Sequence, residues 1–338
     1  MKILSALTKW LISRGDQKAG NLPFSDPRSA RLRNGSAQPD FHLNFLRLND
    51  YFGPCHRSSS GRWALSWLDS APTGGRGGHR ETGDGFFVLY DTEQGRIVTE
   101  GNLQRPNNGH VADNGSFSIE DWHFGGDLSG TLHVFDHEGS LLLARSVTAN
   151  IVDSAISGNG QYAICQTANS PTEDGNKLFL FDLATGRELY KVSPSAGWPE
   201  RYEIDNQTGH VIAHIKDVGA FRYDQQGQLI GAEDIVGARL RSPRYDVALL
   251  AAEQLLKGGE LTNDDANQIL ESVALFRGKH PDAQDSWKAI AFKVEGFVYT
   301  AKGESSKAIS AFDAALALNP KIGVKRKRDA LARRSRLE

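Results

Sequence analysis

The stretch KLFLFDLATGREL, residues 177–189, has the pattern of a strand, a tight turn and a second strand. Apolar residues fill both faces of its first half, which is typical of a buried strand. Asp182 can accept a hydrogen bond from the backbone two residues on, and Gly186 can adopt the positive φ that a tight turn needs. The stretch therefore predicts a β-hairpin.

The same hairpin pattern occurs three more times. In each copy an aromatic residue precedes an aspartate, and a glycine follows three or four residues later. The further copies are FFVLYDTEQGRIV (86–98), TLHVFDHEGSLL (131–142) and GAFRYDQQGQLI (219–230). The aspartates Asp91, Asp136, Asp182 and Asp224 are 45, 46 and 42 residues apart. A period of about 40–50 residues built from short strands is typical of propeller blades.

Each copy also has a strand upstream of it, which follows a polar turn ending in glycine. These upstream segments are residues 58–67, 112–122, 157–167 and 205–215. With one strand crossing to the next copy, the pattern predicts four-stranded meanders. Residues 41–236 resemble the propeller repeats of the YVTN and WD-type families, and SGNGQYAICQT (157–167) and the 177–189 stretch carry the likeness. The Trp-Asp dipeptide of WD repeats is missing, and propellers include both enzymes and scaffolds.

The N-terminal region is predicted to be an arm. Residues 1–14 have the spacing of an amphipathic helix, which would dock on the rest of the protein or, in the second interpretation, lie on a membrane surface. Residues 15–40 are polar and are predicted to be a linker. Residues 41–48, FHLNFLRL, alternate as a single strand does. That strand would belong to a degenerate fifth blade copy or would close the ring against the last blade.

After Pro243 the pattern becomes helical. Residues 245–256 and 263–277 place apolar side chains on single faces. Residues 289–320 resemble a tetratricopeptide repeat at Gly296, Tyr299, Gly303, Ala308, Phe312, Ala315 and Pro320. The resemblance implies two closely packed helices with Phe312 buried between them. Its departures are Phe292, where tryptophan is common, and Glu295, where an apolar residue is usual.

Together these patterns predict a multi-domain β + α protein. Residues 1–40 form the helix and linker arm, and residues 41–240 form a small β-propeller of four blades, with a fifth left open. Residues 241–338 form a tetratricopeptide-like array of helical hairpins that ends in a basic capping helix. Such caps keep repeat arrays soluble.

Composition indicates an ordinary soluble protein, since 39% of the residues are hydrophobic and 24% are charged. Two cysteines, Cys55 and Cys165, form no disulfide framework and indicate a reducing compartment or buried thiols. No apolar run approaches the roughly 18 residues of a membrane span. The predicted location is therefore the cytoplasm, and no transmembrane segment is expected.

Basic residues gather at the C-terminal end. Residues 321–338 hold eight Lys and Arg against two acids, a net charge of +6 that leaves −8 for residues 1–320. The favoured interpretation is a solvated final helix, and the alternative is a tail that binds the phosphate backbone of nucleic acid. The tail residues are Lys325, Arg326, Lys327, Arg328, Arg333, Arg334 and Arg336.

The loops between the second and third strands of the blades vary in length and composition. Equivalent propeller loops collect on one face, where binding residues gather. Aromatic side chains with arginine fit a protein-binding hot spot, while packing of Trp67 and Trp122 between blades is an equal alternative. The candidate partner-binding residues are Trp67, His79, Arg80, Trp122, His123, Asn169 and Trp198.

Motifs for enzyme chemistry are missing from the sequence. GGRGG at 74–78 lacks the spacing of a phosphate-binding loop, and there is no GxSxG, HExxH or CxxC motif. His79 with Glu81 and Asp121 with His123 are interpreted as surface pairs, so no metal, no cofactor and no catalytic residue is predicted.

The sequence thus predicts a non-enzymatic adaptor whose partners are other proteins. One alternative is a hydrolase or lyase with a polar pocket at the propeller axis, which three or more convergent His, Asp or Glu side chains would favour. The other is a nucleic-acid-associated protein that uses the basic tail.

Overall fold

The computed structural model describes residues 39–49, 51–70, 79–124, 126, 128–232, 234–259 and 261–334. The helix expected at 1–14 lies outside these residues. The chain divides into two compact units, one of residues 1–213 with 222–228 and the other of residues 214–221 with 229–338. The boundaries near residues 40 and 240 stay predictions.

The first sheet contains six antiparallel strands in chain order, β1 to β6. Its strands are β1 (Asp40–His42), β2 (Phe45–Leu48), β3 (Tyr51–Arg57), β4 (Trp63–Leu68), β5 (Gly85–Asp91) and β6 (Arg96–Leu103). The single strand expected over residues 41–48 is wrong. Leu43 has a φ of 53°, and the chain turns there so that His42 pairs with Phe45. The resulting hairpin extends the first sheet, because β2 pairs with β3.

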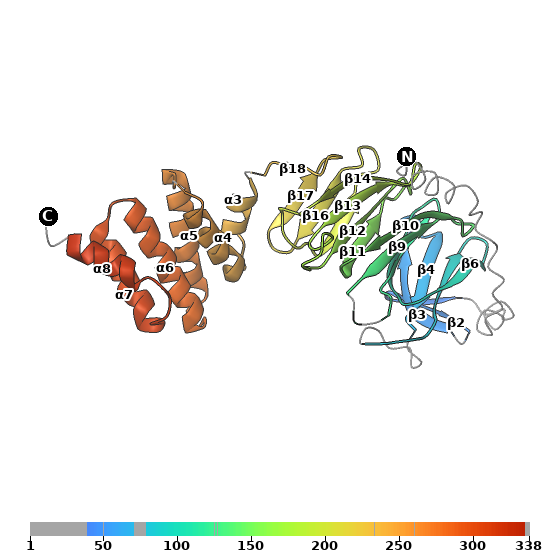
Figure 1. Cartoon of the computed structure of the whole chain (residues 1–338), viewed down its shortest axis with the longest axis horizontal. Helices are drawn as coiled ribbons and strands as arrows, with labels where there is room; N and C mark the ends of the chain where they lie inside the picture. Colours follow the sequence, from blue (N-terminus) through green and yellow to red (C-terminus); the bar gives the residue numbers. More distant parts are fainter. Residues whose placement is uncertain are drawn as a thin grey trace, which may run out of the picture. The chain divides into compact units, whose positions relative to one another are not determined.

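Three four-stranded antiparallel sheets follow (Figure 1). The second contains β7 (Pro106–Val111), β8 (Phe117–Asp121), β9 (Gly130–Phe135) and β10 (Leu141–Val147). The third contains β11 (Ile151–Ile156), β12 (Tyr162–Thr167), β13 (Leu178–Asp182) and β14 (Arg187–Val192). The fourth contains β15 (Arg201–Ile204), β16 (Val211–Ile215), β17 (Gly219–Tyr223) and β18 (Leu229–Ile230).

The repeated hairpins lie in four different sheets, as the sequence period predicts. They are β5–β6, β9–β10, β13–β14 and β17–β18. Each sheet is therefore one propeller-like blade. The first strands of successive blades contact one another, β3 with β7, β7 with β11 and β11 with β15. The described residues form four such sheets and contain no fifth copy.

Turn chemistry explains why these hairpins form. Asp91 Oδ1 accepts the backbone N–H groups of Glu93 at 2.9 Å and Gln94 at 3.0 Å, and Gly95 follows with a φ of 66°. Asp224 accepts two backbone N–H groups in the equivalent turn of the last blade. The repeated aspartate therefore satisfies backbone donors that the turn leaves unpaired.

Aromatic and aliphatic side chains pack between neighbouring blades. One cluster joins β4 and β5 to β7 and β8 and includes Trp63, Trp67, Phe87 and Phe117. Another joins the second blade to the third through Leu132, Val134, Phe179 and Phe181. Burial of these faces removes apolar area from water and stabilises the stack of blades.

The second unit contains six helices among its described residues. They are α3 (Asp234–Leu240), α4 (Tyr245–Lys257), α5 (Asn263–Lys279), α6 (Asp285–Ala301), α7 (Ser305–Leu318) and α8 (Lys325–Arg334). The helices expected at 245–256 and 263–277 match α4 and α5 within two residues. Thr262 caps α5 in a capping box with Asp265. No helix in the described part of the chain is long and apolar enough to cross a membrane.

Close packing of α6 on α7 follows the sequence prediction. Phe312 is fully buried, and its ring meets Phe297 edge-on at 5.3 Å between centroids. The chain turns between the two helices at Gly303, whose φ is 74°. Glu295, the departure from the repeat pattern, forms an ion pair with Arg277 of α5.

Candidate functional site

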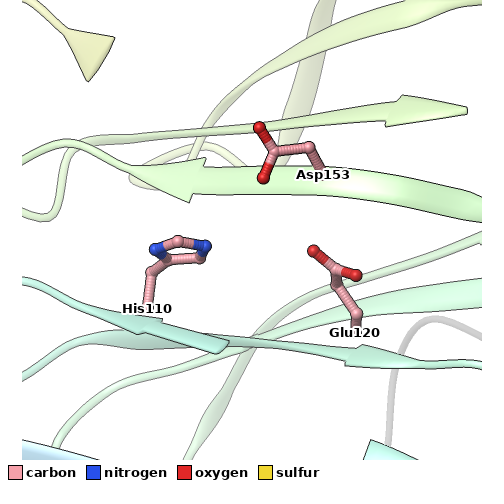
Figure 2. Close-up of side chains that lie close together, drawn as sticks. All are labelled: His110, Glu120 and Asp153. Carbon is pink, nitrogen blue, oxygen red and sulfur yellow. The ribbon is translucent and has the colours of Figure 1, made fainter. Parts of the chain in front are cut away.

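Three side chains that can bind a metal or transfer a proton converge in the first unit. His110 lies on β7, Glu120 on β8 and Asp153 on β11. One nitrogen or oxygen atom of each lies within 4.8 Å of the other two. Figure 2 shows the three side chains directed into one space between their strands.

Strand pairing places these residues together. Asn108 pairs with Glu120 and His110 with Ser118, so Asn108, His110 and Glu120 share one face of the second blade. Asp153 lies on the first strand of the third blade, just after an irregularity in the register between Ile151 and Asp153. Contacts of β11 with β7 and β8 then bring the two blades' polar groups together.

Glu120 is held by two donors. Asn108 Nδ2 donates to Glu120 Oε1 at 3.0 Å, and Trp122 Nε1 donates to Glu120 Oε2 at 3.4 Å. The glutamate is 1% exposed. These two bonds fix the orientation of the carboxylate.

His110 is held against a second histidine. Its ring meets His56 of β3 edge-on, with 4.8 Å between centroids. His56 Nδ1 accepts the backbone N–H of Val111 at 3.1 Å, which fixes the His56 ring. Burial, with His56 as a smaller cause, lowers the pKa of His110 to about 3. The imidazole is therefore neutral at pH 7, and its Nε2 lies 3.5 Å from Asn108 Nδ2.

The pKa of Asp153 is shifted in the opposite direction to that of His110. Burial, and next the Glu120 carboxylate, raise the pKa of Asp153 to about 7. Asp153 Oδ1 accepts the backbone N–H of Ser154 at 3.0 Å. The other oxygen, Oδ2, is inaccessible to water and has no hydrogen-bond partner among the described residues. A buried carboxylate oxygen without a partner is costly, which marks this position for a ligand.

The arrangement can perform two kinds of chemistry. A neutral imidazole and two carboxylates are the donor types that divalent transition metals accept. The same groups can also move a proton near neutral pH, since the pKa of Asp153 is close to 7.

The residues predicted from the loops are spread over different environments. Trp67 is 4% exposed and lies in the cluster between the first two blades, which matches the packing alternative. Trp122 donates to Glu120 and so belongs to the surroundings of the polar site. Arg80 Nη1 lies 3.0 Å from Asp69 Oδ2, and His123 bonds to Thr131 and Ser129.

The other three loop residues are exposed. His79 Nε2 lies 3.7 Å from Glu81 Oε1 in an exposed pair. Asn169 is exposed, and Trp198 is 48% exposed. Partner binding by these residues stays a prediction.

The basic tail is partly engaged in local contacts. Arg328 Nε lies 2.7 Å from Asp313 Oδ1, and Arg328 Nη1 lies 2.9 Å from Asp329 Oδ1. Lys327 Nζ lies over the Phe297 ring, and Arg333 Nε donates to the Asp329 carbonyl. Lys325 and Arg326 are exposed, as are Arg333 and Arg334. Arg336 lies outside the described residues.

Sequence reasoning missed His110, Glu120 and Asp153. The available signal was the polar strand PNNGHV at 106–111, where alternation would place apolar residues. His110 and Asp153 are also 43 residues apart, close to one repeat period. Neither signal identifies Glu120, which looks like an ordinary strand residue beside an aspartate.

Comparisons with known proteins give only distant similarities. No family model and no curated protein matches the chain. The C-terminal WD40 domain of Sif2 is similar at a TM-score of 0.32 and 11% identity, over 48% of this chain and 42% of that chain. The β-propeller domain of Myceliophteria thermophila Cps50 (Swd1) is similar at a TM-score of 0.33 and 10% identity, over 55% of this chain and 63% of that chain. This chain thus covers less than two thirds of either domain chain, and neither similarity bears on its function.

Proposed function

We propose that this protein is a non-enzymatic adaptor that binds other proteins, with its helical unit as one binding surface. The observation that carries the proposal is a pocket between α5 and α6. It is lined by Phe276, Arg277, His280, Pro281, Lys288 and Phe292. Pockets that combine aromatic rings with basic groups are typical of protein-binding hot spots.

The pocket has a defined chemistry. The Arg277 guanidinium lies 4.2 Å from the centroid of the Phe292 ring, and Arg277 Nη1 donates to Glu295 Oε1 at 3.2 Å. Next to it, the Tyr245 ring packs on Phe276, His280 and Trp287. The residues that line the pocket include basic groups and no carboxylate. An acidic segment with an apolar side chain therefore suits this pocket better than a basic one.

Affinity purification of the full chain from its host tests this proposal. We expect Lys288→Glu to lose the captured partner, because it reverses a charge at the pocket. The matched control is Lys257→Glu, which reverses the charge of an exposed lysine at the end of α4. If Lys288→Glu captures the partner as well as the unmodified chain does, the helical pocket is not the binding surface, and the propeller loops become the candidate surface.

A hydrolase or lyase is the second candidate, because His110, Glu120 and Asp153 converge. On this alternative Asp153 would act as the proton-transferring group. A screen of ester, phosphoester and glycoside substrates tests it, since Asp153→Asn must then abolish any turnover. Together with the adaptor function, we propose that the protein is located in the cytoplasm and that its helices are tetratricopeptide-like.

A further inference from the structure

We infer that His110, Glu120 and Asp153 form a binding site for one divalent transition-metal ion, Zn²⁺ or Mn²⁺. The inference concerns the first unit alone and does not depend on the adaptor proposal. Its ligands come from two neighbouring blades, so the ion would link the second blade to the third.

The spacing of the donor atoms fits an ion. Bonds from zinc to imidazole nitrogen and carboxylate oxygen are about 2.0–2.2 Å, so two ligands of one ion lie roughly 3–4.4 Å apart. The three donor atoms lie within 4.8 Å of one another, and small side-chain rotations would close the difference.

The electrostatics of the cluster favour a cation at its centre. The His110 ring and the carboxyl groups of Glu120 and Asp153 are directed toward the same space (Figure 2), and their donor atoms lie within 4.8 Å of one another. Asp153 Oδ2 is buried without a hydrogen-bond partner. A bound ion would give the carboxylate oxygen the opposite charge that it lacks.

The surroundings are built as in metal sites, where outer groups orient the ligands. Asn108 and Trp122 fix Glu120 through its two oxygens. His56 packs on His110, and the backbone N–H of Ser154 holds Asp153 Oδ1. Each of the three ligands therefore has at least one neighbour that limits its rotation.

The donor set decides between metals. Mg²⁺ and Ca²⁺ prefer sites made of oxygen atoms alone. An imidazole nitrogen beside two carboxylates suits Zn²⁺ and Mn²⁺, while Cu(I) and iron–sulfur clusters favour softer sulfur ligands.

Metal binding by the purified, metal-stripped full chain tests the inference. We expect one tight site per chain for Zn²⁺ or Mn²⁺ and a much weaker response to Mg²⁺ and Ca²⁺. Asp153→Asn and Glu120→Gln keep the side-chain shape, and each should weaken binding at least about 10-fold. His79→Ala is the matched control, because it removes a histidine that is exposed and lies outside the cluster. The metal affinity of His79→Ala should equal that of the unmodified chain.

A second measurement covers variants that fail to fold. In the unmodified chain, paramagnetic Mn²⁺ should broaden the imidazole resonances of His110 and His56 before that of His79. Broadening of exposed histidines alone, or equal metal affinity in Asp153→Asn and the unmodified chain, would overturn the inference. Failure of the adaptor proposal would change neither result.

Discussion

Gly296 faces Phe312 so closely that a Cβ atom on Gly296 would lie 2.5 Å from Cε1 of the ring. Since real Cβ atoms do not approach other atoms this closely, the two helices α6 and α7 depend on the missing side chain. The contact joins helices at the core of the second unit, where Phe312 is fully buried.

Gly296→Ala should therefore destabilise the helical unit, by about 1–3 kcal/mol, because an extra methyl group forces the ring or the helices apart. Gly278→Ala is the control, since Gly278 lies on α5 with no atom near its Cβ position. That substitution should raise stability by about 0.5–1 kcal/mol through helix propensity. Urea unfolding followed by circular dichroism at 222 nm would measure both, and similar values for the two variants would contradict the packing argument.

Phe312→Ala should remove about 3–5 kcal/mol from the stability of the same unit, through lost burial and a cavity. The first unit has its own packed clusters, so its β structure should unfold at an unchanged urea concentration. Separate transitions read by circular dichroism and by tryptophan fluorescence would measure this. A single transition that shifts as a whole would mean that the two units unfold together.

Asp91→Ala should be the most damaging change among the hairpin aspartates. Asp91 is 0% exposed and accepts from Arg62 at 2.9 Å as well as from two backbone N–H groups. Losing these bonds should cost about 2–3 kcal/mol. Asp136 holds the equivalent turn with two backbone bonds and no ion pair among the described residues, so Asp136→Ala should cost only about 1 kcal/mol. Thermal unfolding of the two variants, compared side by side, measures the difference.

Asp153 should give the first unit a distinctive pH dependence in the presence of a chelator. Its pKa of about 7 exceeds the roughly 3.9 of an unfolded aspartate, so the folded state binds the extra proton and the Asp153 contribution to stability falls as pH rises from about 4 to 7. His110, with its pKa of about 3, acts in the opposite direction below about pH 6.5.

The comparison that isolates Asp153 is therefore between Asp153→Asn and the unmodified chain. The stability of the variant relative to the unmodified chain should rise from pH 4.5 to pH 7.5. Urea midpoints at the two pH values measure it. A difference that is constant with pH would show that Asp153 has an ordinary pKa.

The basic tail should not bind nucleic acid. Arg328 is paired with Asp313 and Asp329, and Arg333 Nε donates to the Asp329 carbonyl, so part of the basic charge of α8 is used in local contacts. We expect no binding to duplex DNA or single-stranded RNA in 50 mM salt by fluorescence anisotropy. Binding that falls steeply with salt and is lost in Lys325→Glu with Arg326→Glu would establish the tail as a phosphate-binding element.

The blades were predictable because each repeats one piece of local chemistry. The aspartate–glycine turns at Asp91 and Asp182 specify their hairpins within a few residues, and the period of the repeat specifies that the hairpins occupy separate sheets. The α6–α7 contact was predictable because residues 289–320 resemble a tetratricopeptide repeat, in which Gly296 and Phe312 stand at signature positions. The turn at Leu43 was not, because a leucine with positive φ has no local signature.

The polar site was beyond sequence reasoning for a geometric reason. Residues two apart on a strand normally share a face, but the register shifts between Ile151 and Asp153 and between Pro106 and Asn108. At such bulges the alternation reverses, so Ile151 is buried with the apolar cluster while Asp153 meets His110 and Glu120. Loop residues such as Trp67 were more conspicuous by type, yet Trp67 is part of the packing between blades.

The two cysteines give the chain a built-in chemical reporter. Burial raises the pKa of Cys55 to about 11, and burial likewise raises that of Cys165, which is fully inaccessible. At neutral pH only about one Cys55 side chain in ten thousand is therefore in the reactive thiolate form. Both thiols lie in the first unit, and the helices contain none. The rate at which a thiol reagent labels the folded chain consequently reads the opening of the blades alone, and it stays silent while the helices unfold.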